Sequence, residues 1–137
     1  MKIRIMQLKD FDSIYALWKK VDLGVNDFEK EKKQAKQMIK LNPLSNFVAV
    51  EGKKIRGTVF GTFNGRRGWV YHLAVNPSFQ KKGLGSILLK KAEQALKKAG
   101  AKRVLLGVDK SNLKVLAFYK KQGYQKVDDA IWMGKDI

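Results

Sequence analysis

The sequence has no cysteine and only one histidine, His72. The lack of cysteine excludes disulfide bonds, thiolate metal sites and a cysteine nucleophile. A single histidine also removes most metal sites built on imidazole, so we expect no bound metal. No apolar run approaches the roughly 18 residues that a membrane-spanning helix needs, and the alternating start lacks the apolar block of a signal peptide. We therefore expect a cytoplasmic protein without a membrane partner.

Acidic residues are also scarce, because 12 Asp and Glu stand against 29 Lys and Arg and give a formal net charge of +17. Such a surface favours polyanions, including nucleic acid, ribosomes and phosphate-rich cofactors. The lysines are spread along the chain, however, and runs such as EKEKKQAK have the pattern of a solvated helix face. The charge therefore favours a lysine-rich solvated surface over a nucleic-acid or ribosome interface.

The N-terminal half has the pattern of one strand, two helices and then a group of antiparallel strands. Residues 2–7 alternate like a strand, and Asp10 is placed to cap a helix with apolar residues at helical spacing over 11–21. A second, highly charged helix is expected at 27–39, with Pro43 preventing its continuation. The antiparallel strands are predicted on either side of an Asn-Gly turn and a Gly-Lys turn, at 46–51, 55–63 and 68–75.

The C-terminal half predicts alternating helices and strands. A helix at 84–99 is followed by Gly100, a common residue just after a helix C-terminus. The strand, helix, strand order around it implies a right-handed crossover and a parallel strand pair. Ser111 or Asn112 is expected to cap the next helix. The remaining elements are predicted as a strand at 103–108, a helix at 110–123 and final strands at 124–127 and 131–137.

The whole pattern fits one α+β domain spanning residues 1–137. With 45% hydrophobic residues, a chain of this length can bury one core. No linker, repeat or low-complexity segment interrupts the elements. We expect a single mixed, mostly antiparallel sheet flanked by helices.

The stretch QKKGLGS, residues 80–86, lies between a predicted strand and a predicted helix. A helix N-terminus presents unpaired N–H groups with a partial positive charge, and glycine lets an anion approach the backbone closely. Lys81 and Lys82 add positive charge, so the stretch predicts a phosphate cradle, with an ordinary glycine-rich turn as the alternative. The stretch does not contain the Gly-Lys-Ser/Thr that ends a Walker loop. It also does not match the Rossmann fingerprint, because Leu88 stands where that motif has its third glycine.

Two segments together closely resemble the GNAT superfamily of N-acetyltransferases, in particular its small single-domain bacterial members. They are LAVNPSFQKKGLGSILL and SNLKVLAFYKKQGY. The Q-x-x-G-x-G of residues 80–85 matches the acetyl-CoA pyrophosphate motif of the family. The C-terminal signature of the family is matched by Asn112, Tyr119, Gly123 and Tyr124. The resemblance covers residues 45–137 well, and the order of elements also fits 1–44.

The resemblance implies the acyl-CoA N-acyltransferase fold, in which two neighbouring parallel strands splay apart and the pantetheine arm of acetyl-CoA lies between them. Backbone groups near Leu73 and Val75 would bind this arm, together with the Asn112 side chain. Tyr119 would point at the thioester sulfur. The pyrophosphate would be bound by the loop residues Gln80, Lys81, Lys82, Gly83, Leu84, Gly85 and Ser86.

The implied reaction is direct transfer of an acetyl group from acetyl-CoA to a primary amine. Tyr119 would protonate the leaving thiolate or donate a hydrogen bond to it. Full proton transfer from a tyrosine of pKa about 10 to a thiolate near 8.5 is uphill by ~2 kcal/mol, so both roles are retained.

The general base is not evident from the resemblance. Many family members carry a glutamate at the position of Trp69 or of Gly107, and this sequence has a carboxylate at neither. His72 is the candidate base because its ordinary pKa of about 6.5 suits proton abstraction. Strand alternation places it on the face opposite Tyr71, and the alternatives are a core histidine, a water relay or an amine that arrives neutral. Tyr71 and Asp109 are weaker candidates for the same role.

The acceptor stays open among small amines, peptide N-termini and protein lysines. Trp18 and Phe28 would either line the acceptor pocket or belong to the core. Two functions without catalysis compete with the enzyme: a basic RNA- or ribosome-binding module, and a CoA-sensing regulatory protein. The chain is expected to be a monomer or a homodimer, the latter paired through residues 131–137.

Overall fold

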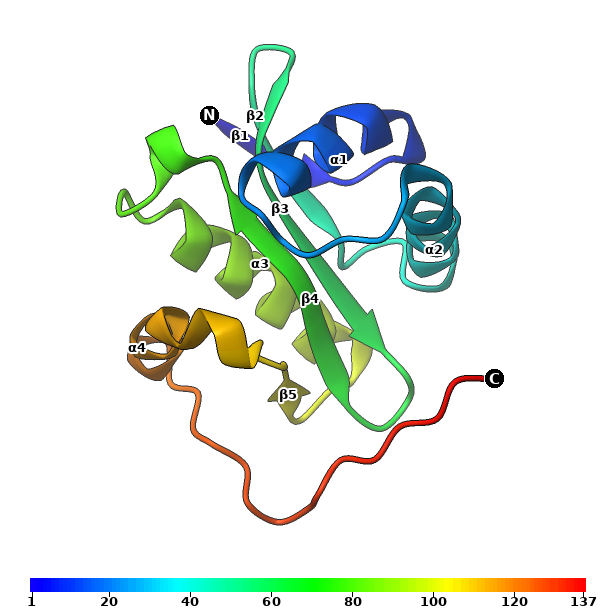
Figure 1. Ribbon diagram of the computed structural model, residues 1–137, viewed down its shortest axis with the longest axis vertical. Coiled ribbons are helices and arrows are strands. Elements are labelled where there is room, and N and C mark those ends of the chain that lie inside the picture. Colours follow the sequence, from blue (N-terminus) through cyan, green and yellow to red (C-terminus); the bar gives the residue numbers. More distant parts are fainter. The chain divides into compact units, whose positions relative to one another are not determined.

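The computed structural model describes all 137 residues and divides them into two compact units, Met1–Leu106 and Gly107–Ile137 (Figure 1). The first unit contains β1 (Lys2–Ile5), α1 (Phe11–Lys20), α2 (Phe28–Leu41), β2 (Phe47–Glu51), β3 (Lys54–Phe63), β4 (Gly68–Val75), α3 (Leu84–Ala99) and β5 (Val104–Leu105), with short 3₁₀ turns at Leu8–Asp10 and Pro77–Phe79. The second unit contains a 3₁₀ segment, Lys110–Val115, and α4 (Leu116–Lys121).

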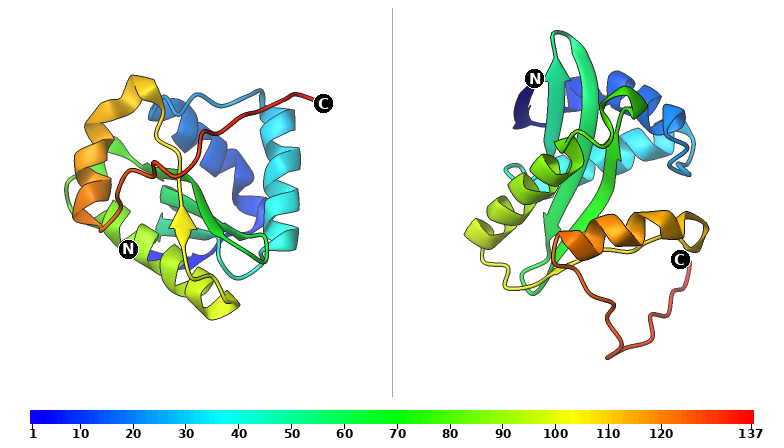
Figure 2. Two further views of the ribbon diagram at one scale, coloured as in Figure 1. Left: turned by 90° about the horizontal axis from the view of Figure 1, so that it is seen from below. Right: turned by 90° about the vertical axis from the view of Figure 1, so that its left-hand side faces the viewer.

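The first unit is built on one five-stranded sheet of order β1-β2-β3-β4-β5. The pairs β1–β2, β2–β3 and β3–β4 are antiparallel, and β4–β5 is parallel. Helix α3 covers one face of this sheet, and α1 and α2 lie on the other (Figures 1 and 2). The predicted mixed, mostly antiparallel sheet flanked by helices is confirmed.

The core between the sheet and α1 is rich in aromatic rings. Trp18 of α1 is fully buried and contacts Phe11 and Phe60, with ring centroids 5.8 and 5.9 Å away. Phe28 of α2 packs against the same cluster, 5.3 Å from Phe11. The Trp18 indole N–H donates to the Thr58 hydroxyl at 3.0 Å, so its one polar atom is satisfied inside the core. Trp18 thus belongs to the core, and Phe28 is partly buried against it.

The N-terminus of α1 differs from the prediction for Asp10. Its carboxylate makes no cap hydrogen bond to the helix. It instead accepts two hydrogen bonds from the Arg4 guanidinium, both 2.8 Å, and one from the Gln7 N–H at 2.8 Å. A charge-assisted bidentate pair is stronger than a single cap bond, which explains the outcome. The predicted cap of the segment at 110 is also wrong, because the Asp109 side chain accepts from the Ser111 N–H there.

The two final strands predicted at 124–127 and 131–137 are wrong. No strand is present in either segment, and every residue from 128 to 137 is exposed. A strand with no buried face has nothing to fix its register, and the charges of Asp128 and Asp129 separate the two apolar runs. The strand predicted at 103–108 is also shorter, because only Val104 and Leu105 pair with β4.

None of the helices combines the length and the apolar character needed to cross a membrane.

Glycine lets β3 pack tightly at Gly61, which gives a test of the core. A Cβ added there would lie 2.7 Å from the Ser45 carbonyl oxygen and 3.4 Å from side-chain atoms of Ala92 and Leu96. We expect Gly61→Ala to lower the free energy of unfolding by about 1–3 kcal/mol, because backbone must move to admit the methyl group. Urea unfolding measures this value. The control is Gly107→Ala, whose Cβ meets nothing within 4 Å. An equal loss in both variants would contradict the packing explanation.

Candidate functional site

A β-bulge interrupts β4 in its middle. Thr58 pairs with Ala74 and Phe60 with Tyr71, so one residue of β3 faces two residues of β4, His72 and Leu73. His72 has φ +48°, in the left-handed region that is uncommon for residues other than glycine. Such a conformation costs on the order of 1–3 kcal/mol and persists only when its surroundings impose it. A bulge bends its strand and redirects a side chain, which makes this point of β4 a candidate site.

The strand pairing of β4 also ends near the bulge on one side. β4 pairs with β5 only through Gly68 and Trp69. From Val70 onward, therefore, the edge of β4 toward β5 carries backbone groups without a strand partner there. Leu73 and Val75, predicted to bind the pantetheine arm, lie in this stretch.

The bulge turns His72 toward α1. Its ring lies 4.4 Å from Trp18 and 6.0 Å from Phe60, edge on to both. Tyr71 is the pairing partner of Phe60, so its side chain lies on this same face of the sheet. The expectation that alternation separates His72 from Tyr71 is therefore wrong, because the extra residue of the bulge breaks the period of two.

His72 carries an unsatisfied polar atom. Its Nδ1 is buried and has no hydrogen-bond partner. Burial lowers the pKa of His72, and the nearby Glu31 carboxylate acts in the opposite direction without cancelling that effect. The imidazole is thus neutral at pH 7 and able to accept a proton.

Glu31 is a buried carboxylate that the sequence analysis does not single out. Only 4% of its surface is exposed, and its Oε2 accepts from the Asn26 backbone N–H at 2.8 Å and from the Asn26 amide at 3.1 Å. The charged run around it predicts a solvated face. Its spacing from Phe28 and Ala35, three and four residues away, was the available signal that it lies on the buried face of α2.

An aromatic pair lies next to His72 along β4. The rings of Trp69 and Tyr71 stack 6.3 Å apart with an interplanar angle of 17°. Tyr71 remains 44% exposed, and partial burial raises the pKa of its hydroxyl. The bulge region thus combines a neutral imidazole, a buried carboxylate and a partly exposed aromatic surface.

The predicted phosphate cradle forms the connection between β4 and α3. The Gln80 side-chain amide donates to the Val75 carbonyl at 3.0 Å, which ties the loop to the end of β4. Lys81 and Gly83 both have left-handed backbone, with φ +62° and +85°. A Cβ at Gly83 would meet nothing within 4 Å, so glycine is favoured there by its backbone angle rather than by lack of space.

Gly83 is the N-cap residue of α3 and has no side chain to bind the first N–H groups of that helix. The first helical residues, Leu84 and Gly85, therefore present their N–H groups at an end with partial positive charge. Lys81 and Lys82 are exposed beside it, and the Lys82 ammonium lies 5.8 Å from the Phe79 ring. This arrangement has the donors and the charge that a diphosphate requires.

The second unit contains the other two predicted site residues, Asn112 and Tyr119. Asn112 lies at a kink in the 3₁₀ segment, with φ −125° and ψ 44°, and its N–H donates to the Asp109 carbonyl at 2.8 Å. The Tyr119 ring contacts Phe118 and Tyr124, with centroids 5.1 and 5.9 Å away. Burial raises the pKa of Tyr119, so its hydroxyl keeps its proton at pH 7.

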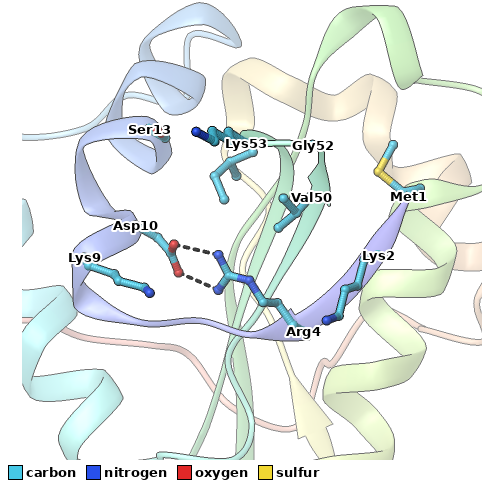
Figure 3. Close-up of a pocket in the computed structure, with 10 residues that line it drawn as sticks. Met1, Lys2, Arg4, Lys9, Asp10, Ser13, Val50, Gly52 and Lys53 are labelled. Atoms are coloured by element: carbon cyan, nitrogen blue, oxygen red, sulfur yellow. Dashed lines mark hydrogen bonds and ion pairs between the residues drawn. The ribbon is translucent and has the colours of Figure 1, made fainter.

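A cavity of about 670 Å³ lies elsewhere in the first unit (Figure 3). Its basic lining includes Lys2, Lys9 and Lys53, and the Arg4–Asp10 ion pair closes one side of it. None of the predicted site residues lines it. The candidate site is therefore the bulged part of β4 and the loop that follows, and this cavity is a separate feature.

Comparison with known proteins agrees with the motifs. A model of the Acetyltransferase (GNAT) family matches residues 11–124. An acetyltransferase of Pectobacterium atrosepticum is 31% identical over 137 residues, which are 100% of this chain and 96% of that protein.

Solved structures show the same fold. Ard1 from Thermoplasma volcanium superimposes with a TM-score of 0.81 at 21% identity, over 93% of this chain and 84% of that chain. A Clostridium acetobutylicum protein described as a predicted acetyltransferase, determined with acetyl-CoA, gives 0.76 at 19% identity, over 97% of this chain and 95% of that one.

The lowered pKa of His72 predicts a pH-dependent stability. Below the ordinary histidine pKa of about 6.5, the unfolded chain binds a proton that the folded imidazole takes up only at lower pH. The free energy of unfolding should therefore fall as the pH drops below about 6.5, and His72→Gln should remove this part of the decrease. Urea unfolding at several pH values measures it in both proteins. Parallel pH profiles would show that His72 is not the cause.

Proposed function

Because the chain belongs to the GNAT acetyltransferase family, we propose that it transfers the acetyl group of acetyl-CoA directly to a primary amine. The observation that carries this proposal is the order of three elements along the chain. The bulged strand β4, with its edge unpaired from Val70 onward, is followed by a basic loop and then by α3, which begins after Gly83. A thioester bound along such an edge would meet backbone donors at its carbonyl and an anion site at its pyrophosphate.

Acetyl-CoA is the proposed co-substrate, and the residues present fit its parts. The exposed N–H groups and lysines of the loop at 80–86 would bind the pyrophosphate. The backbone of Leu73 and Val75 would hydrogen-bond the pantetheine arm, and Asn112 would bind the same arm. The acetyl-CoA in the Clostridium structure supports this choice.

In the proposed reaction the amine nitrogen attacks the thioester carbonyl carbon, and a C–N bond forms. The carbonyl oxygen takes the negative charge, which backbone N–H groups at the bulge would stabilise. The C–S bond then breaks, and the electron pair leaves with sulfur. The nitrogen loses one proton, and the thiolate gains one, so that the products are an amide and free CoA.

His72 and Tyr119 are the proposed proton-transfer residues. A neutral imidazole at the bulge can accept the proton that the amine must lose, and burial keeps His72 in that form. Tyr119 is protonated at pH 7, so it can donate a hydrogen bond or its proton to the leaving sulfur. A water relay to solvent would serve the first role if His72 does not.

The loop lysines give a direct test of cofactor binding. We expect Lys81→Ala with Lys82→Ala to weaken acetyl-CoA binding about tenfold, because two charges beside the pyrophosphate are lost. Calorimetric titration measures this affinity. The matched control is Lys90→Ala with Lys91→Ala, which removes two exposed lysines from the middle of α3. If the wild-type protein binds no acetyl-CoA, the proposed function is wrong. If both double variants lose the same affinity for acetyl-CoA, the lysines act through the general charge of the surface and not through the loop.

Replacing the Tyr119 hydroxyl separates catalysis from binding. Tyr119→Phe should retain the affinity for acetyl-CoA and lower kcat by at least about tenfold, because the leaving thiolate loses its donor. Steady-state assays of CoA release, with an acceptor found by screening amines, measure kcat. Unchanged turnover in the variant would remove Tyr119 from the mechanism.

A further inference from the structure

We propose that the cavity of Figure 3 is a second ligand site, which binds a small organic phosphate. It shares no residue with the loop at 80–86, and the proposed acetyltransferase function neither requires nor predicts it. The inference comes from the apolar floor of the cavity and the uncompensated charge of its rim. Its volume of about 670 Å³ lies within the range of small-molecule sites, roughly 300–1,000 Å³.

The floor of the cavity is a row of side chains that crosses three strands. Lys2 of β1 pairs with Val50 of β2, and Val50 pairs with Ile55 of β3, so the three side chains lie on one face of the sheet. Ile55 is buried in the core cluster that includes α1, and Val50 packs against this cluster. The floor is therefore a preformed apolar surface that can accept the organic part of a ligand.

Three segments of the chain bring cationic groups to the rim of this floor. Lys2 and Arg4 come from β1, in which residues two apart share a face. Lys9 lies in the 3₁₀ turn before α1, and Lys53 lies in the two-residue turn between β2 and β3, where Gly52 has φ +61°. Figure 3 shows Lys2 and Lys9 on either side of Arg4, with Lys53 above them in this view. The four cations thus surround one space.

The positive charge of the rim is not compensated by the protein. Asp10 is the only carboxylate that lines the cavity, and Arg4 and the Gln7 N–H already donate to both of its oxygens. The ion pairs of the structure include none of the three lysines. With four cationic side chains and one carboxylate, the lining has a net charge of +3. Like charges around one cavity repel each other, and a bound anion would offset this repulsion.

The donors of the rim favour phosphate over carboxylate. Three of the five N–H groups of Arg4 donate to the Ile5 carbonyl and to Asp10, so its planar fork is already occupied by a carboxylate. The lysine ammonium groups act as point charges with three donors each, which suits the several oxygens of a phosphate group. The Ser13 hydroxyl also lines the cavity and can donate to a phosphate oxygen.

The test uses phenyl phosphate, which is mostly a dianion at about pH 7.5, and phenol as its neutral counterpart. The amide NMR signals of Gly52 and Gly83 report separately on the cavity and on the 80–86 loop, because each glycine belongs to one of them. We expect phenyl phosphate to shift the Gly52 signal saturably and phenol not to shift it. Inorganic phosphate should bind at least about tenfold more weakly, because it has no apolar part to cover the floor.

A double variant of the rim tests the role of its charge. Lys9→Ala with Lys53→Ala should weaken phenyl phosphate binding about tenfold or more, because two of the four cations are lost. The matched control is Lys33→Ala with Lys36→Ala, which removes two exposed lysines of α2 outside the cavity. It should change the affinity by less than about twofold, because exposed charges at a distance are screened. Should the rim variant fail to fold, Lys53→Ala alone, at an exposed turn, should weaken binding severalfold, and no change would overturn the proposal.

Several results would contradict a phosphate site in the cavity. They are the absence of a saturable Gly52 shift, a shift of Gly83 alone, equal binding of phenol or of inorganic phosphate, and equal losses in the two double variants. Isophthalate, an aromatic dicarboxylate of the same charge, should bind more weakly than phenyl phosphate, and equal affinity would overturn the choice of phosphate. The titration contains no CoA, so a failure here leaves the proposed function standing, and absence of acetyl-CoA binding leaves the cavity site standing.

Discussion

Two hydrogen bonds of the buried Thr58 hydroxyl connect α1, β3 and β4 and underlie the candidate site. The hydroxyl accepts from the Trp18 indole at 3.0 Å and donates to the His72 carbonyl at 2.9 Å. Thr58 itself is fully buried. The strained residue of the bulge is thus connected to the largest fully buried side chain of the core, which offsets the cost of its left-handed backbone.

Most elements could be predicted because local signals agreed with tertiary structure. The helix Leu84–Ala99 was predicted with its observed ends, since apolar spacing, a preceding glycine and Gly100 all agreed. The bulge could not be predicted, because the residues of β4 have the pattern of a regular strand and no glycine marks the position of positive φ at His72. The segments at 124–127 and 131–137 were wrongly predicted as strands. Their composition is typical of strands, but they have neither a partner strand nor a buried face.

The candidate site was partly predictable for the same reason. Gln80 to Ser86 carry their signal in sequence, because glycines and lysines directly before a helix are typical of an anion site, although an ordinary turn has the same pattern. Glu31 carries almost none, since its burial depends on how α2 packs and its neighbours are solvated lysines. The conformation of the 80–86 loop thus depends on local backbone chemistry, whereas the burial of Glu31 in α2 depends on long-range packing.

The exposed lysines of the 80–86 loop have a consequence for the end of a catalytic cycle. An amine that becomes an amide can no longer be protonated, so the acetylated nitrogen has no charge for the protein to attract. Free CoA keeps its phosphates and its attraction to the basic loop. Under the proposed function, the amide would therefore leave first and CoA last, and release of CoA would be the step that salt accelerates.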